Sequence, residues 1–562
     1  MPYPYDLGAF SRETSTGAPE ARSWFDRGLV WTYAFNHEEA IACFERALVA
    51  DSGFALAYWG LAYAAGPNYN KQWEAFDEAD LHTSLRRAHD ATHRAIDLSL
   101  ATPAVERDLI RALSSRYPSP EPQDDMVGWQ EAYAGAMREV AAAHPDDLDV
   151  AALFADALLN VTAWSLWDLG TGQPADGAHT LEARQVLEAA LARPDGMRHP
   201  GLLHFYIHLM EMSPTPEAAL EAANALRALV PGAGHLLHMP THIDVLLGDY
   251  EQVIAGNERA IAADDRYLAD AGPLNFYSLY RAHDHHFRIY GAMFAGRQAP
   301  ALAAADALAA ALPAQLLRVE SPPMADWLES FVGMRLHVLV RFGHWEALIA
   351  EPLPEDPQLY GVTTALTHYA KGVAYAASSR VGEAAQERER FLAALSRVPE
   401  SRYLFNNTAR DILAIAGAML DGEIAYRNGD YESAWIHLRR AIELDDTLPF
   451  DEPWGWMQPT RHAYGALLLE QGEIEAALAV YAADLGSDRA LPRACQHPNN
   501  VWSLHGYHEC LVRLGRIEDA AVIKPRLDRA LALADVPITA SCFCRLPSSA
   551  SEHASHRRYR RE

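Results

Sequence analysis

The feature that most limits how this chain can fold is a short turn signature that recurs along it. The signature is a glycine, a polar residue, an aromatic or aliphatic residue and, about five positions after the glycine, an alanine or valine; its clearest copies are LGDYEQV (247–253), NGDYESA (428–434), QGEIEAA (471–477) and LGRIEDA (514–520). Glycine often ends a helix because it readily adopts the left-handed backbone conformation. Apolar residues spaced three and four apart flank each copy, without the alternation typical of strands. The sequence therefore predicts an all-α chain of helical hairpins.

The residues around these turns fit the tetratricopeptide pattern, a repeat of about 34 residues with small or apolar residues at its eighth, twentieth and twenty-seventh positions. A bulky residue at the twenty-fourth position is expected to fill the space between neighbouring hairpins. Such hairpins stack into a right-handed superhelix with a concave inner groove. We expect a continuous tetratricopeptide-repeat-like α-solenoid over residues 1–545 and a disordered basic tail at 546–562. Three copies show the fit: Gly28, Ala40, Phe44 and Ala47; Gly422, Ala434, Leu438 and Ala441; Gly465, Ala477 and Tyr481.

Histidines recur at the same few positions in consecutive repeats, over residues 200–290. The register set by Ala219 and Pro231 places them at positions 5 and 9 of one repeat and at positions 2, 5 and 9 of the next. After a longer connection, the turn at Gly296 and Ala301 sets a third register, with His283 and His286 at positions 2 and 5 and Tyr290 at position 9. On a helix these positions lie within an arc of about 60°, and in repeats of this type that arc faces the groove. The side chains expected to converge there are His204, His208 and Glu211; His235, His238 and His242; and His283, His286 and Tyr290.

Such a cluster predicts a transition-metal site. Imidazole is the commonest protein ligand for these metals, and helical spacings of three or four residues aim two side chains at one ion. The excess of nitrogen donors argues against magnesium and calcium, and favours copper, then iron or zinc. Seven histidines leave open two ions, or one ion with catalytic imidazoles beside it. Glu211 is a candidate ligand or general base, and Tyr280 and Tyr290 are candidates to hydrogen-bond an oxygenic ligand.

A second group of candidate residues lies near the C-terminus. His462 and His505 each occupy position 5 of a repeat. If the superhelix curls enough, they would meet the first cluster across the groove as further catalytic residues, with Trp454, Trp456 and Trp502 closing a pocket.

The cysteines are five in number, which is too few for a disulfide framework in 562 residues. We interpret them as reduced thiols. The spacing Cys542-x-Cys544 fits a copper(I) or zinc ligand pair, a redox pair or inert cysteines.

Composition limits the partners of the chain. Its 75 acidic and 47 basic side chains give a formal charge of −28, which disfavours nucleic acid and anionic membranes because both would be repelled. No stretch approaches the roughly 18 apolar residues of a spanning helix, and the N-terminus lacks the pattern of a secretory signal. We expect a cytoplasmic protein.

Several histidine-containing motifs carry a resemblance to a known family. They include HFYIHLMEMSPTPEAAL (204–220), GHLLHMPTHIDVLLGDYEQVI (234–254) and CQHPNNVWSLHGYHECL (495–511). The chain resembles bacterial and fungal tetratricopeptide-repeat proteins with histidine-rich inner helices, over nearly its whole length. The family usually has Asn where this chain has Asp284. The resemblance implies the solenoid fold.

Three functions are compatible with these observations. The first is a metal-dependent enzyme, an oxidase or oxygenase acting on a small organic substrate in the groove. The second is a scaffold whose groove holds a peptide or a partner protein. The third is a metal storage or delivery protein without turnover.

Overall fold

The computed structural model describes residues 3–545, and α-helices form almost all of the regular structure in this range. The predicted basic tail, 546–562, lies outside the described residues. The α-helices of the first half are α1 (Pro19–Tyr33), α2 (His37–Ala50), α3 (Ala55–Ala65), α4 (Glu78–Leu98), α5 (Ala104–Arg116), α6 (Val127–Ala143), α7 (Leu148–Val161), α8 (Thr180–Leu191), α9 (Pro200–Glu211), α10 (Leu220–Leu226), α11 (Gly234–His238), α12 (Pro240–Leu247), α13 (Tyr250–Ala271) and α14 (Tyr277–Phe294).

The remaining elements complete the array. The α-helices of the second half are α15 (Gln298–Ala311), α16 (Ala314–Leu317), α17 (Met324–Val332), α18 (Met334–Arg341), α19 (Trp345–Ala350), α20 (Gly361–Ala377), α21 (Val381–Leu395), α22 (Ala409–Arg427), α23 (Tyr431–Asp446), α24 (Thr460–Gln471), α25 (Ile474–Asp484), α26 (Val501–Arg513) and α27 (Ile517–Leu533). Short 3-10 helices are η1 (Trp73–Ala75), η2 (Ser99–Ala101), η3 (Gly196–Arg198), η4 (Pro216–Ala219) and η5 (Arg493–Cys495). The strands β1 (Tyr403–Leu404) and β2 (Asn407–Thr408) form one small antiparallel pair.

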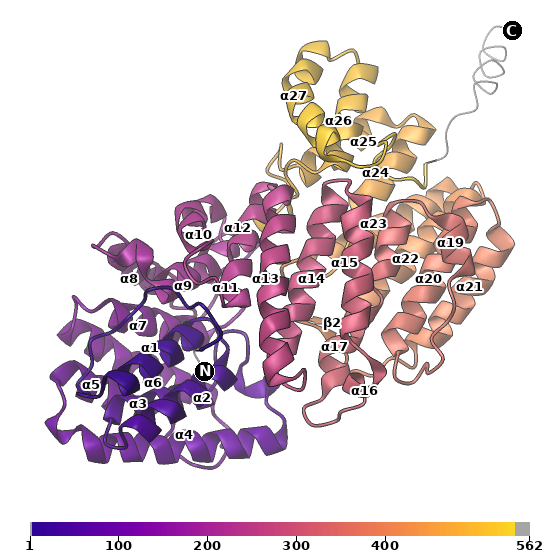
Figure 1. Ribbon diagram of the computed structural model, residues 1–562. Helices are drawn as coiled ribbons and strands as arrows, with labels where there is room; N and C mark the ends of the chain where they lie inside the picture. Colours follow the sequence, from indigo (N-terminus) through magenta and orange to yellow (C-terminus); the bar gives the residue numbers. More distant parts are fainter. Residues whose placement is uncertain (1–2, 546–562) are drawn as a thin grey trace, which may run out of the picture.

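Helices that follow one another in the sequence pack side by side, as α1 does with α2, α20 with α21 and α22 with α23. The array runs from the indigo N-terminal helices through α13 and α14 at its centre to α19–α22, and α24–α27 lie above it (Figure 1). One hydrophobic core extends through the stack from Leu7 to Ile538. This all-α, tetratricopeptide-repeat-like solenoid confirms the predicted fold class.

The signature glycines end helices as predicted. Gly248, Gly429, Gly472 and Gly515 have φ angles of 74°, 78°, 83° and 72°, which is the left-handed region that glycine adopts without steric cost. The second helix of each hairpin begins two residues later, at Tyr250, Tyr431, Ile474 and Ile517. The signature therefore predicts the position of each of these four turns to the residue.

Small and bulky residues alternate where hairpins meet, also as predicted. The Phe44 ring lies between Gly28 of its own hairpin and Gly60 of the next, and a Cβ atom on either glycine would come within 2.6 Å of that ring. Tyr481 packs against Gly465 in the same way, with 2.5 Å left for a Cβ. Contacts this close require glycine, because a methyl group would force the helices apart.

The histidine-rich run 234–250 is two helices, not the single apolar helix that its sequence suggests. Helix α11 ends at His238 and α12 begins at Pro240. Proline has no amide hydrogen and its ring clashes with the preceding turn, so it starts a helix more readily than it continues one. His238 and His242 are four residues apart across this boundary, and their Nε2 atoms lie 2.7 Å from each other.

The structure corrects the interpretation of the cysteines as reduced thiols. Cys542 and Cys544 are joined by a disulfide bond. Cys43, Cys495 and Cys510 are free and buried, which agrees with inert thiols because burial raises the pKa of Cys495 and of Cys510 to about 12.

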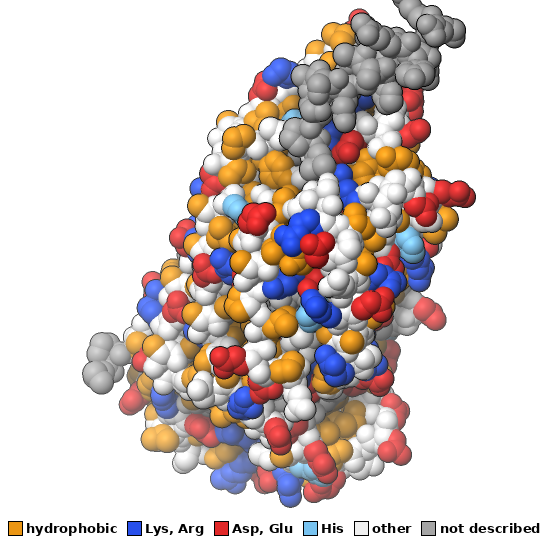
Figure 2. Space-filling model, turned by 90° about the vertical axis from the view of Figure 1, so that its right-hand side faces the viewer, with side chains coloured by type: hydrophobic (Ala, Val, Ile, Leu, Met, Phe, Trp, Pro, Cys, Tyr) orange, Lys and Arg blue, Asp and Glu red, His pale blue; other side chains and the backbone are white. Residues whose placement is uncertain are grey.

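The described surface mixes charges of both signs, and on the face drawn in Figure 2 acidic, basic and apolar side chains are interspersed with few histidines. Among the described helices, none is both long and apolar enough to cross a membrane.

Candidate metal centre

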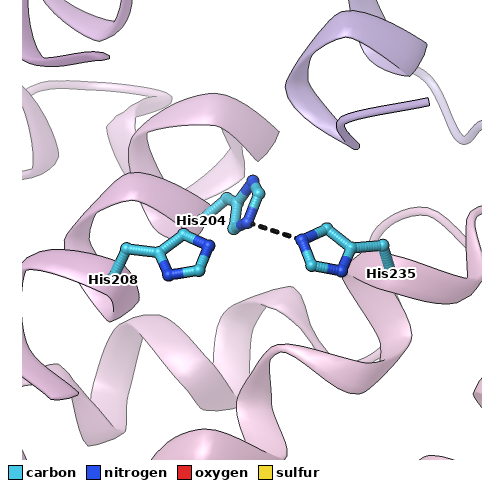
Figure 3. A group of neighbouring side chains, drawn as sticks. All are labelled: His204, His208 and His235. Atoms are coloured by element: carbon cyan, nitrogen blue, oxygen red, sulfur yellow. Dashed lines mark hydrogen bonds between the residues drawn. The ribbon is translucent and has the colours of Figure 1, made fainter. Parts of the chain in front are cut away.

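Three histidine nitrogens converge between α9 and α11. His204 and His208 lie one turn apart on α9, and His235 faces them from the start of α11 (Figure 3). The Nε2 atoms of His204 and His235 are 3.2 Å apart, and one ligand atom from each of the three residues lies within 4.8 Å of the others. Two nitrogens bound to one tetrahedral metal are about 3.4 Å apart. This first histidine group can therefore hold a metal ion.

A second histidine group lies beside the first. It comprises His238 of α11, His242 of α12 and His283 of α14, whose ligand atoms also lie within 4.8 Å of one another. The Nε2 atoms of His238 and His242 are 2.7 Å apart. The groups are neighbours, because the ring centroids of His235 and His238 are only 6.0 Å apart.

The outer ring nitrogens of four histidines meet hydrogen-bond acceptors. In the first group, His204 Nδ1 lies 2.6 Å from the Tyr33 carbonyl oxygen, and His208 Nδ1 lies 2.9 Å from Glu211 Oε1. In the second group, His238 Nδ1 lies 2.6 Å from Asn257 Oδ1, and His242 Nδ1 lies 2.6 Å from Glu452 Oε2. An acceptor at Nδ1 fixes the proton there and leaves the Nε2 lone pair for a metal. Among the described residues, His208 Nε2 is buried without a hydrogen-bond partner.

Burial keeps most of these imidazoles neutral. Desolvation, assisted by neighbouring histidines, holds the pKa of His204, His235, His238 and His283 well below the usual value of 6.5. A neutral imidazole is the form that binds metal. Their exposed fractions are 6% or less, so each of these imidazoles is almost completely buried.

His242 differs because two carboxylates contact it. Burial alone would lower its pKa, but Glu211 and Glu452 overcome this and raise it to about 10. Nδ1 lies 2.8 Å from Glu211 Oε2 and 2.6 Å from Glu452 Oε2. Its Nε2 atom lies 2.7 Å from His238 Nε2, and a metal ion bound there would need both imidazoles in their neutral form. Glu211, His242 and Glu452 form a third potential metal-binding group.

A cavity of about 540 Å³ opens beside both histidine groups. His208, His235, His242 and His283 line its inner end, and Tyr280 lies beside them. The Tyr280 ring centroid is 4.6 Å from that of His235. A cavity of this size accommodates a small organic molecule in contact with the histidines.

Three aromatic residues with a strained backbone enclose the site. Phe35, Trp164 and Phe405 have positive φ angles of 54°, 60° and 49°. The ring centroid of Phe35 lies 4.5 Å from that of His204, and the centroid of Trp164 lies 5.9 Å from that of His208. The centroid of Phe405 lies 4.5 Å from that of His283. A bulky residue in this region costs about 1–3 kcal/mol, and such strain concentrates at functional sites. The alignment of strain with the histidines indicates a functional centre.

The structure does not bring every predicted residue to this site. His286 Nε2 lies 2.8 Å from Met457 Sδ, outside the three metal-binding groups. Tyr290 packs on Phe294 with ring centroids 4.3 Å apart. The other candidates lie further along the chain.

The two C-terminal histidines belong to other environments. His462 lies 2.9 Å from an Arg341 guanidinium nitrogen and 3.0 Å from Asp484 Oδ2. His505 is half-buried on α26, in the field of Glu509. The residue from the C-terminal half that contacts the histidine groups is Glu452, which lies beside His242. Of the predicted tryptophans, Trp454 donates to the Asp445 carbonyl and Trp456 packs on His337.

Several residues at the site were not among those predicted from the sequence. Phe35 carried a signal, because it stands two residues before α2, where the signature has glycine. Tyr69 and Asn70 also line the cavity. Glu452 and Asn257 carried no local signal, since they reach the histidines from other elements.

Comparisons with known proteins support no closer assignment. No protein-family model and no curated protein matches the chain. Among solved structures, one of Naa15/Naa10 bound to HypK-THB is 16% identical over 91% of this chain and 70% of that chain, with a TM-score of 0.21. A human IFIT1 dimer with PPP-AAAA is 12% identical over 83% and 97%, with a TM-score of 0.31. The repeat architecture therefore rests on the helices and turns of this chain, and membership of the histidine-rich family stays a prediction.

Proposed function

We propose that this protein is a metal-dependent oxidoreductase, an oxidase or oxygenase that acts on a small organic substrate beside a buried transition-metal centre. The observation that carries the proposal is the pair of adjacent histidine groups facing one cavity. Six imidazoles from α9, α11, α12 and α14 would hold the metal, with copper favoured, then iron or zinc, because the donors are almost all nitrogen. When bound, such an ion would supply the capacity to activate dioxygen.

The residues of the chain have separable roles in this proposal. The acceptors at Tyr33, Glu211, Asn257 and Glu452 would orient the imidazoles. Glu211, fully buried between His208 and His242, is the candidate to hold a proton near the substrate. Burial would raise the pKa of Glu211, but these two histidines lower it, so the carboxylate is ionised and able to accept a proton.

The enclosed position of the histidines favours an enzyme over a peptide-binding scaffold. A peptide in a solenoid groove needs an open inner face, whereas the histidines here are almost completely buried. Metal storage or delivery does not need an aromatic-walled cavity next to the ligands. The expected lack of nucleic-acid and membrane partners and the cytoplasmic location stay predictions.

Metal analysis of the purified protein tests the proposal. After anaerobic reconstitution with copper(I), iron(II) or zinc(II), elemental analysis should find stoichiometric metal in the wild type. His208→Ala and His238→Ala should each lower the content while circular dichroism remains unchanged. Oxygen consumption with a panel of phenols and amines then separates an oxidase from a carrier. Absence of stoichiometric metal in the wild type would refute a metal enzyme, and metal without oxygen consumption would leave storage or delivery.

A further inference from the structure

The cavity beside the histidines has aromatic walls from its inner to its outer end. At the inner end the ring centroids of Tyr69 and His208 are 4.6 Å apart, and those of Phe405 and His283 are 4.5 Å apart. Further out, the ring of Phe276 packs against Trp327, with centroids 5.3 Å apart, and both residues line the cavity. Aromatic walls favour a planar ring as ligand, because rings pack well in edge-to-face and offset-stacked arrangements.

Away from the histidines, the charged side chains on the cavity wall are all carboxylates. Apart from the histidines, the ionisable carboxylates on the lining are Glu74, Asp326 and Asp451, and no lysine or arginine is among the described lining residues. Glu74 is exposed at the rim. The other polar lining groups include the amides of Asn70 and Asn406. The two cations next to these lining residues already have carboxylate partners, because Arg402 pairs with Asp326 and Lys71 pairs with Asp80. Away from the histidines, the described cavity wall therefore offers an anionic group no unpaired cation, and burying an unpaired anion is costly.

We propose that the cavity takes aromatic compounds whose substituent remote from the histidines is uncharged or cationic, such as phenols and arylalkylamines, and that it rejects aromatic carboxylates. This rests on the proposed function, in which the histidine end of the cavity is the reaction site. The cavity volume of about 540 Å³ leaves room for a compound with at least one ring and a side chain.

Binding to the metal-free protein under anaerobic conditions tests this inference. The probes are 4-ethylphenol, tyramine and 4-hydroxyphenylacetate, which share a phenol ring and carry a neutral, a cationic and an anionic end at neutral pH. Isothermal titration calorimetry should show binding of the first two and at least about tenfold weaker binding of the third. Equal or tighter binding of 4-hydroxyphenylacetate, or binding of none of the three, overturns the inference. Because neither metal nor turnover is needed, this result is independent of the metal analysis.

Two kinds of variant place the probe in this cavity. Phe405→Ala should weaken 4-ethylphenol binding about tenfold, whereas Tyr431→Ala, which removes a ring that is 40% exposed on α23, should leave it unchanged. Glu74→Lys reverses the charge of an exposed side chain on the cavity lining. It should strengthen 4-hydroxyphenylacetate binding about threefold and weaken tyramine binding by a similar factor. Unchanged affinities in both Phe405→Ala and Glu74→Lys would refute binding in this cavity.

Discussion

Asn257 offers the sharpest test of how the metal centre is built, because it contacts a predicted ligand without being one. Its Oδ1 lies 2.6 Å from His238 Nδ1. Its Nδ2 donates to the Val253 carbonyl at 2.8 Å and to Thr241 Oγ1 at 3.2 Å, so the amide can present only its oxygen to the histidine. Asn257→Ala removes the acceptor that fixes the His238 proton on Nδ1.

The size of the expected effect follows from these contacts. Loss of such an outer hydrogen bond lowers metal affinity about 10- to 100-fold, or roughly 1.4–2.7 kcal/mol. Asp284 Oδ1 lies 3.1 Å from the same nitrogen and remains as a partial acceptor. We therefore expect about a tenfold loss in Asn257→Ala. Asn257→Asp retains an acceptor oxygen and should stay within about threefold of the wild type.

The assay is competition with a chelator of known affinity under anaerobic conditions, with unfolding of the metal-free proteins measured in parallel. Asn224→Ala is the matched control, because Asn224 is exposed and its side chain accepts a hydrogen bond from Arg227, away from the histidines. Metal affinity in Asn257→Ala equal to that of the control would refute the role of Asn257. If His238→Ala also matched the control, the second histidine group would not be a metal site.

Three further predictions concern the ligand set, the pH response and the packing. His283→Ala should lower the metal content whereas His286→Ala should not, because the His286 ring contacts a methionine outside the metal-binding groups; equal losses in elemental analysis would contradict this. Burial would raise the pKa of Asp149, but the ion pair with Arg12 holds this pKa below the usual 3.8. The ion pair therefore stabilises the fold fully above about pH 4, and this stabilisation is lost as the pH falls through the folded-state pKa of Asp149. Asp149→Asn should cost about 3 kcal/mol at pH 7 and progressively less below pH 4 in urea titrations; a constant difference would argue against the ion pair. Gly465→Ala should destabilise the protein by about 1–3 kcal/mol, while Gly135→Ala, with open space at its Cβ, should be neutral or stabilising in thermal unfolding.

The repeat periodicity was sufficient to predict the fold and much of the candidate centre. Close packing at Gly28 and Gly465 and the turn at Gly472 follow from local rules that act within one or two hairpins. The repeat registers also predicted His204 and His283 as site residues, and both belong to groups that could hold a metal ion. Helical periodicity succeeds here because each repeat presents equivalent positions to the same side.

Periodicity alone could not separate His283 from His286. Both lie on the same helix three residues apart, yet one turns toward His238 and the other toward Met457. Glu452 was unpredictable for a different reason. Its contact with His242 joins residues 210 positions apart, and no local pattern encodes where a distant loop will pass.

The way distant segments meet at the centre limits how this solenoid can vary. In most repeat proteins each unit contacts only its neighbours, so units can be deleted or duplicated while the remainder still folds. Here the wall around His204 and His242 is assembled from Tyr33 and Phe35, where the first hairpin turns, and from Glu452, which lies 210 residues beyond His242. Deleting one repeat between these segments would shift the superhelix and separate them. Neighbouring repeats therefore pack as separate units, but the histidine site depends on segments from both halves of the chain. We expect the number of repeats between these segments to be fixed, because another number would not bring them together.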